Sequence, residues 1–154
     1  MGKRYITDKQ IHTGVLDIVS QMYAEDWRPD YIVGVTRGGL YPAVLMSHYT
    51  GIKMHTLDVR LRDGDTQEHN AWMADHAQCG TNILVLDDIN DTGETFAWIK
   101  QDWGLDNIAD DIKNVRFATI IDNVPSKFDV DYSSIEINKA EDPAWIVFPF
   151  EEWW

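Results

Sequence analysis

Short apolar segments alternate along this chain with segments of helical periodicity, and this alternation restricts the possible folds more than any other feature. The apolar segments at residues 31–35, 82–86 and 115–121 have the length and composition of buried strands. Strands that alternate with helices are typical of a parallel α/β sheet flanked by helices. The predicted helices span residues 11–22, 40–50 and 93–103, and further short strands are predicted at residues 52–60, 133–137 and 145–148.

The ends of the predicted helices carry recognisable signals. Thr7 and Gln10 have the spacing of a capping box, which places the start of the first helix at Thr7. Pro29 makes continuation of that helix beyond Trp27 unfavourable. Gly51 and Gly104 are suited to end the second and third helices. We therefore expect three well-defined helices between the strands.

Length and charge limit the class of protein. A chain of 154 residues is most simply a single domain, residues 1–154. No apolar segment is long enough to span a membrane or to form a secretory signal, and Cys79 is the only cysteine, so we expect a cytoplasmic protein without a disulfide. The formal net charge of −13 argues against a nucleic-acid partner.

Residues 61–80 are polar, of mixed charge, and interrupt the pattern of strands and helices. We predict a long loop here, with a short helix around Trp72. Loops of this length are often lids over a binding site, and plain surface disorder is an equally weighted alternative.

Polar residues gather where the predicted strand at 82–86 ends. Asp87 and Asp88 follow the strand directly, and residues 91–95 (DTGET) lead into a helix. Parallel sheets bind ligands at the carboxyl ends of their strands. Paired carboxylates suit Mg²⁺ and sugar hydroxyls, and the free N–H groups of a helix start, with the Thr92 hydroxyl, suit a phosphate. Taken piece by piece, the same residues also fit a helix cap and a solvated acidic turn.

The complete stretch at residues 83–96 (ILVLDDINDTGETF) resembles the ribose-phosphate motif of type I phosphoribosyltransferases. No phosphate-binding loop of the Walker type is present. The resemblance implies that this stretch binds phosphoribosyl pyrophosphate (PRPP) and its 5′-phosphate, with the first two acids also holding Mg²⁺. The residues implicated are Asp87, Asp88, Asp91, Thr92, Gly93, Glu94 and Thr95.

Residues 31–40 (YIVGVTRGGL) resemble the pyrophosphate loop of the purine branch of this family. The resemblance implies that Arg37 and Gly38 hold pyrophosphate, and that the Thr36–Arg37 peptide bond is cis. A glycine turn with a surface arginine is the alternative if this loop is considered alone. Arg60 or Arg62 is a further, weaker candidate for the pyrophosphate.

The C-terminal stretch at residues 145–151 (WIVFPFE) is similar to the tail of xanthine-guanine and hypoxanthine phosphoribosyltransferases. The resemblance implies that Trp145 stacks on the base and that Ile146 contributes backbone contacts, with a core tryptophan as the alternative. Relatives carry a lysine that donates to the 6-oxo group of the base. Asn123 aligns best with that lysine, and Lys127 is the alternative, so base identity stays open.

The implied fold is a type I phosphoribosyltransferase fold with a hood loop near residues 61–80 and a base-binding segment near 122–154. The implied reaction transfers phosphoribose from PRPP to a purine base, giving a nucleoside monophosphate and pyrophosphate, with Asp91 as the catalytic base. A non-catalytic PRPP-binding regulator and a transferase for another base are the alternatives. Relatives are commonly dimers or tetramers, so a homo-oligomer is expected.

Overall fold

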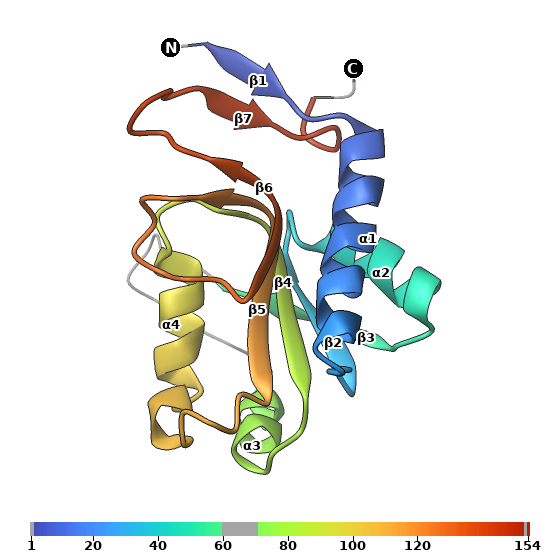
Figure 1. Cartoon of the computed structure of the whole chain (residues 1–154), viewed down its shortest axis with the longest axis vertical. Coiled ribbons are helices and arrows are strands. Elements are labelled where there is room, and N and C mark those ends of the chain that lie inside the picture. The colour runs from blue at the N-terminus through green and yellow to red at the C-terminus, as the bar shows by residue number, and fades with distance from the viewer. Residues whose placement is uncertain (1, 60–70, 153) are drawn as a thin grey trace.

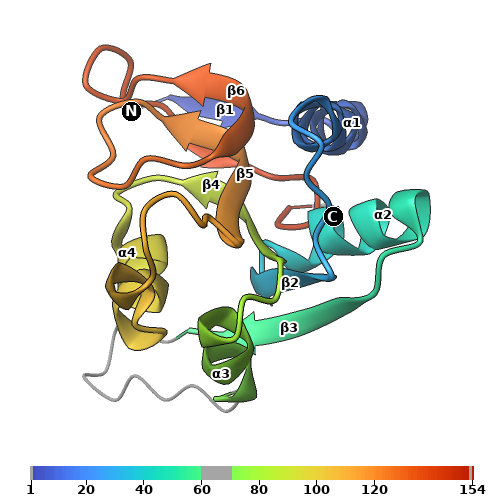
Figure 2. The ribbon, with the colours of Figure 1, turned by 60° about the horizontal axis from the view of Figure 1, so that its bottom comes forward.

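The computed structural model describes residues 2–59, 71–152 and 154, and its centre is a sheet of five parallel strands in the order β3-β2-β4-β5-β6. Helices cover both faces of this sheet, as Figures 1 and 2 show from two directions. The predicted parallel α/β fold is therefore confirmed. The sheet strands are β2 (Tyr31–Thr36), β3 (Met54–Asp58), β4 (Ile83–Asn90), β5 (Val115–Asn123) and β6 (Tyr132–Ile137).

Each face of the sheet has its own apolar core because neighbouring strand residues point to opposite faces. Leu84 and Leu86 of β4 pack with α1 and α2, whereas Ile83 and Val85 pack with α3 and α4. The four helices are α1 (Asp8–Ala24), α2 (Leu40–Thr50), α3 (Trp72–Gln78) and α4 (Glu94–Asp102), and a 3₁₀ turn spans Leu105–Asn107.

The helix ends follow the sequence signals. The capping box is formed: the Gln10 N–H donates to Thr7 Oγ1 at 3.1 Å, and the Thr7 N–H donates to Gln10 Oε1 at 2.8 Å. Gly51 ends α2 in the left-handed conformation, and Gly104 follows α4 with a positive φ. No helix in the described ranges is long and apolar enough to cross a membrane.

Two features of the strands differ from the sequence prediction. β4 continues four residues beyond the apolar segment, because it stays paired with β5 as far as Asn90 opposite Asp122. The second difference is β1 (Lys3–Tyr5), an exposed strand that the sequence pattern did not predict. It pairs in parallel with β7 (Trp145–Val147) in a separate two-stranded sheet. This small sheet lies beyond the carboxyl edge of the main sheet (Figure 1).

The described residues include only part of the predicted hood loop. Residues 60–70, which include the pyrophosphate candidates Arg60 and Arg62, lie outside the described residues. Residues 71–80 contain α3, so the short helix expected around Trp72 is confirmed. Met73 and Ala77 of α3 are buried in the core with α4. Apolar contacts therefore hold this part of the predicted loop against the sheet.

Candidate functional site

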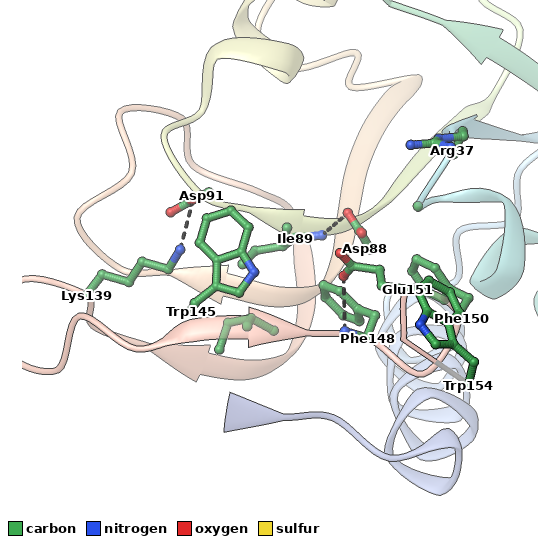
Figure 3. A pocket seen from close by; sticks show the side chains of 12 residues that line it. Arg37, Asp88, Ile89, Asp91, Lys139, Trp145, Phe148, Phe150, Glu151 and Trp154 are labelled. Atoms are coloured by element: carbon green, nitrogen blue, oxygen red, sulfur yellow. Dashed lines mark hydrogen bonds and ion pairs between the residues drawn. The ribbon is translucent and has the colours of Figure 1, made fainter. Parts of the chain in front are cut away.

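A cleft of about 710 Å³ opens at the carboxyl edge of the sheet. It brings together three segments that the sequence singled out: the loop after β2, the end of β4 with the following turn, and the C-terminal segment around β7 (Figure 3). The lining residues are Arg37, Gly38, Asp88, Ile89, Asp91, Lys139, Trp145, Ile146, Phe148, Phe150, Glu151 and Trp154.

Asp87 and Asp88 lie side by side in the last part of β4, both half-buried. Burial raises the pKa of both carboxyl groups, and the neighbouring Asp88 charge raises that of Asp87 further. Hydrogen bonds from backbone N–H groups partly offset the free-energy cost of burying these two charges. The Asp88 N–H donates to Asp87 Oδ1 at 2.8 Å, and the Ile89 N–H donates to Asp88 Oδ1 at 2.7 Å. In the described ranges neither carboxylate has an ion-pair partner.

This pair of carboxylates fits a divalent cation that is completed by substrate oxygens. Mg²⁺ is commonly bound by one or two carboxylates together with phosphate oxygens and water. Within the described residues there is no group of three or more side chains able to hold a metal by themselves. The protein therefore supplies the two carboxylates predicted to bind Mg²⁺, and the ligand would have to supply the rest.

The turn at residues 91–95 forms a second, smaller hollow of about 210 Å³, lined by residues 87–96. Gly93 has a φ of 89°, and a Cβ there would lie 2.7 Å from the Phe128 nitrogen, so only glycine fits. The start of α4 has no side-chain cap at Gly93, and the turn is not filled by neighbouring side chains. Glu94 and Thr95 form the first turn of α4, as predicted, and both residues line this hollow. The Glu94 N–H donates to Thr92 Oγ1 at 3.4 Å.

The loop after β2 approaches the end of β4 closely. The Thr36–Arg37 peptide bond is cis, as the family resemblance implied. A Cβ at Gly38 would overlap the Asp88 carboxylate, so the absence of a side chain allows the loop to lie against that acid. Arg37 and Gly38 both line the cleft, together with Asp88.

Trp145 is 56% exposed and lines the cleft, which rules out the alternative of a core tryptophan. Its backbone is fixed by the small sheet: the Trp145 N–H donates to the Gly2 carbonyl at 2.9 Å. The Ile146 side chain is buried, and the residue also borders the cleft. The small sheet therefore fixes the backbone of Trp145, and the indole ring faces the cleft (Figure 3).

Asn123, which was predicted to contact the base, is not among the residues that line the cleft. Its side chain is buried. Asn123 Nδ2 donates to the Asp91 carbonyl at 2.9 Å, and Asn123 Oδ1 accepts from the Lys139 N–H at 2.9 Å. Because both ends of this amide are engaged, Asn123 joins two backbone segments instead of meeting a ligand.

Lys139 lines the cleft and was missed in the sequence. Its ammonium lies 2.9 Å from Asp91 Oδ2 and 5.6 Å from the centre of the Trp145 ring. Lys139 follows β6, and the carboxyl end of that parallel strand lies at the same edge as those of β4 and β5. The rule that parallel sheets bind ligands at the carboxyl ends of their strands could therefore have identified Lys139. The alternative, Lys127, is exposed, lines none of the hollows near this edge, and contributes its backbone N–H to the Thr92 carbonyl.

Comparisons with known proteins agree with this geometry. The family model "Phosphoribosyl transferase domain" matches residues 5–153. Xanthine-guanine phosphoribosyltransferase of Cereibacter sphaeroides is 28% identical over 130 residues, which are 81% of this chain and 70% of that protein. A methionyl-tRNA formyltransferase of Wolinella succinogenes is 25% identical over 119 residues, and the match spans 73% of this chain but only 39% of that protein.

Solved structures show the same fold. The purine phosphoribosyltransferase of Pyrococcus horikoshii superimposes with a TM-score of 0.73 at 24% identity. The match covers 99% of this chain and 95% of the other. The shared architecture therefore includes both the main sheet and the C-terminal segment that carries Trp145.

Proposed function

The chain belongs to the phosphoribosyl transferase family, and from that premise we propose that it transfers 5-phosphoribose from PRPP to a purine base with the help of Mg²⁺. The observation that carries the proposal is the cleft that brings the loop at Arg37 and Gly38, Asp88 of β4, and Trp145 together from distant parts of the chain. The products are a nucleoside monophosphate and pyrophosphate.

The proposed binding of PRPP divides its charged groups between two loops. The N–H groups at the start of α4 and the hydroxyls of Thr92 and Thr95 hold the 5′-phosphate, since these donors face an open hollow. Arg37 and the backbone at Gly38 hold the pyrophosphate. Asp87 and Asp88 hold Mg²⁺, which when bound would offset the charge of the leaving pyrophosphate. This arrangement fixes C1 of the sugar between the two loops.

The base is proposed to lie on Trp145 with one ring nitrogen facing Asp91. A flat aromatic ring stacks on an indole irrespective of its substituents, so Trp145 positions a base without identifying it. The C1–O bond breaks with its electron pair leaving on pyrophosphate, and the free lone pair of the unprotonated nitrogen in the five-membered ring of the base forms the new C1–N bond. The proton on the other nitrogen of that ring, which faces Asp91, passes to the Asp91 carboxylate.

A panel of bases tests the proposal. The protein is incubated with PRPP, Mg²⁺ and one of hypoxanthine, guanine, xanthine, adenine or uracil, and pyrophosphate release is measured. We expect release with at least one purine and loss of release when the metal is chelated. Binding of PRPP without release for any base would identify a regulator instead of an enzyme, and release with uracil alone would identify a transferase of another kind.

A further inference from the structure

The proposed phosphate turn at residues 91–95 lies against a second segment, residues 123–128, which begins at the end of β5 and which we call the clasp. The Lys127 N–H donates to the Thr92 carbonyl at 3.1 Å. At Gly93 the two segments approach so closely that a Cβ would lie 2.7 Å from a backbone nitrogen of the clasp. The backbone of the clasp therefore contacts two successive residues of the turn.

The turn contributes little to its own order. Gly93 has no side chain to restrict the backbone, and α4 begins there without a side-chain cap. The Glu94 N–H reaches Thr92 Oγ1 only at 3.4 Å, which is long for a hydrogen bond. The conformation of the turn therefore depends on its contacts with the clasp.

Asn90 anchors the clasp to the main sheet. This last residue of β4 is 3% exposed, and its Nδ2 donates to the Phe128 carbonyl at 2.8 Å and to Asp122 Oδ1 at 2.9 Å. An amide nitrogen has two N–H donors, so both are engaged. The Phe128 ring is a second anchor, since its centre lies 5.5 Å from that of Phe96 and 4.9 Å from that of Phe117. An apolar residue in place of Asn90 would suit a buried strand but would leave the Phe128 carbonyl without this donor.

We propose that Asn90 is a positioning residue for the 5′-phosphate of the substrate. It fixes the Phe128 carbonyl, the clasp in turn holds the Thr92 carbonyl, and the donors of the turn are in place before the ligand binds. This inference rests on the proposed function, since it concerns the turn that would hold the phosphate of PRPP. A site that is formed for only a fraction of the time loses affinity in proportion to that fraction. A looser clasp should therefore weaken phosphate binding without removing any residue of the turn.

Binding of ribose 5-phosphate, measured by calorimetric titration, tests the role of Asn90 without turnover. Asn90→Leu has nearly the same size but no donors. We expect it to weaken ribose 5-phosphate binding by about 5- to 150-fold, because the Phe128 carbonyl loses its donor. Magnesium pyrophosphate, which is proposed to bind at the loop after β2, should bind this variant as it binds the wild type. A general structural defect would weaken both ligands.

Ser126→Ala tests the clasp by a milder change. The Ser126 hydroxyl accepts from the Phe128 N–H at 3.2 Å, and the residue is only half-buried, so the variant should fold. Loss of this one hydrogen bond should weaken ribose 5-phosphate binding by about 2- to 10-fold. Circular dichroism verifies that each variant folds, and if Asn90→Leu does not, Ser126→Ala decides by the same comparison of the two ligands.

Asn114→Leu is the matched control. Asn114 is also 3% exposed, and its Nδ2 donates to two carbonyls, those of Ala77 at 2.8 Å and Thr81 at 2.9 Å. It precedes β5 and lines neither the cleft nor the hollow at the phosphate turn. This variant should lose stability as Asn90→Leu does, and it should bind ribose 5-phosphate as the wild type does.

The outcomes separate the role of Asn90 from the proposed function. Wild-type affinity for ribose 5-phosphate in Asn90→Leu, or equal losses for ribose 5-phosphate and pyrophosphate, would overturn the assignment. Ribose 5-phosphate binding that depends on Asn90, without pyrophosphate release from any base, would instead leave Asn90 assigned and refute the proposed transfer.

Discussion

At the scale of single residues, the site depends on close pairs of side chains from different segments. Asp91 and Lys139 meet across 48 positions of sequence, and Gly38 lies against Asp88. Asp91, Gly38 and Asp88 were indicated by sequence motifs, whereas Lys139 was identified only by its contact with Asp91. The consequences of changing such residues can be stated individually.

Replacement of Asp91 by asparagine tests its role as the proton acceptor. We expect Asp91→Asn to lower kcat by about 10²- to 10⁴-fold, the usual contribution of general base catalysis, with the KM for PRPP little changed. The fold should be retained, because the Asp91 side chain is 41% exposed and partly exposed ion pairs contribute little to stability. Steady-state kinetics and circular dichroism provide the measurements. Asp110→Asn, at an exposed acid away from the cleft, is the control, and near wild-type kcat in Asp91→Asn would show that another group takes the proton.

Addition of one methyl group tests the contact between the loop after β2 and β4. Gly38→Ala should raise the KM for PRPP by about 5- to 150-fold, because the new methyl group overlaps the Asp88 carboxylate and overpacking typically costs about 1–3 kcal/mol. Gly2→Ala is the control, since a Cβ there has no neighbour within 4 Å. If Gly38→Ala binds PRPP as the wild type does, the Asp88 carboxylate is not needed in its observed position.

At the scale of secondary-structure elements, the main sheet is a frame whose carboxyl edge collects the functional loops. Parallel pairing aligns the ends of β2, β4, β5 and β6, and α1 and α2 stabilise one face of this frame. No residue of α1 lines the cleft, whereas Tyr41 of α2 packs against the lining residue Phe150. The stability of α1 can therefore be altered without replacing a residue of the cleft.

The capping box of α1 provides such a test. Thr7→Ala should lower the free energy of unfolding by about 1 kcal/mol, because the Gln10 N–H loses its acceptor at the helix start. Urea denaturation measures the change. Thr13→Ala alters the same residue type at an exposed position inside α1 and should change the stability by no more than about 0.5 kcal/mol. Equal effects of both substitutions would mean that the cap does not contribute to stability.

At the scale of the whole molecule, a net charge of −13 opposes the approach of a phosphorylated ligand. The cleft itself provides little compensation, since Arg37 and Lys139 are matched by Asp88, Asp91 and Glu151 among its lining residues. Local N–H donors and a bound cation can hold an anion in such surroundings, but they do not attract it from a distance.

The rate of association should therefore increase with ionic strength. Salt screens the repulsion between an acidic protein and an anion, so the association rate constant of ribose 5-phosphate should rise as sodium chloride is added. Stopped-flow fluorescence measures this rate. Uncharged ribose serves as the control and should show no such increase. A rate that falls with salt would mean that the cations of the cleft dominate the field that the ligand encounters.

The sequence by itself determined the α/β class, the starts and ends of the helices and the two loops with special geometry. These features depend on local signals: apolar periodicity, the Thr7–Gln10 cap, and glycines at positions such as 93 where the backbone requires them. The motif at 83–96 also indicated the family, because all its residues are adjacent in the chain.

Only the tertiary structure decided which residues face the cleft. β1 was unpredictable because its exposed residues acquire a partner, β7, that lies about 140 positions away. Asn123 was assigned to the base from its position alone, and the structure shows its amide engaged by Asp91 and Lys139. Lys139 lies in the site because β6, the strand before it, pairs in parallel with β5 and ends at the same edge of the sheet. The direction of a side chain at a strand end depends on contacts between distant segments, which no local pattern records.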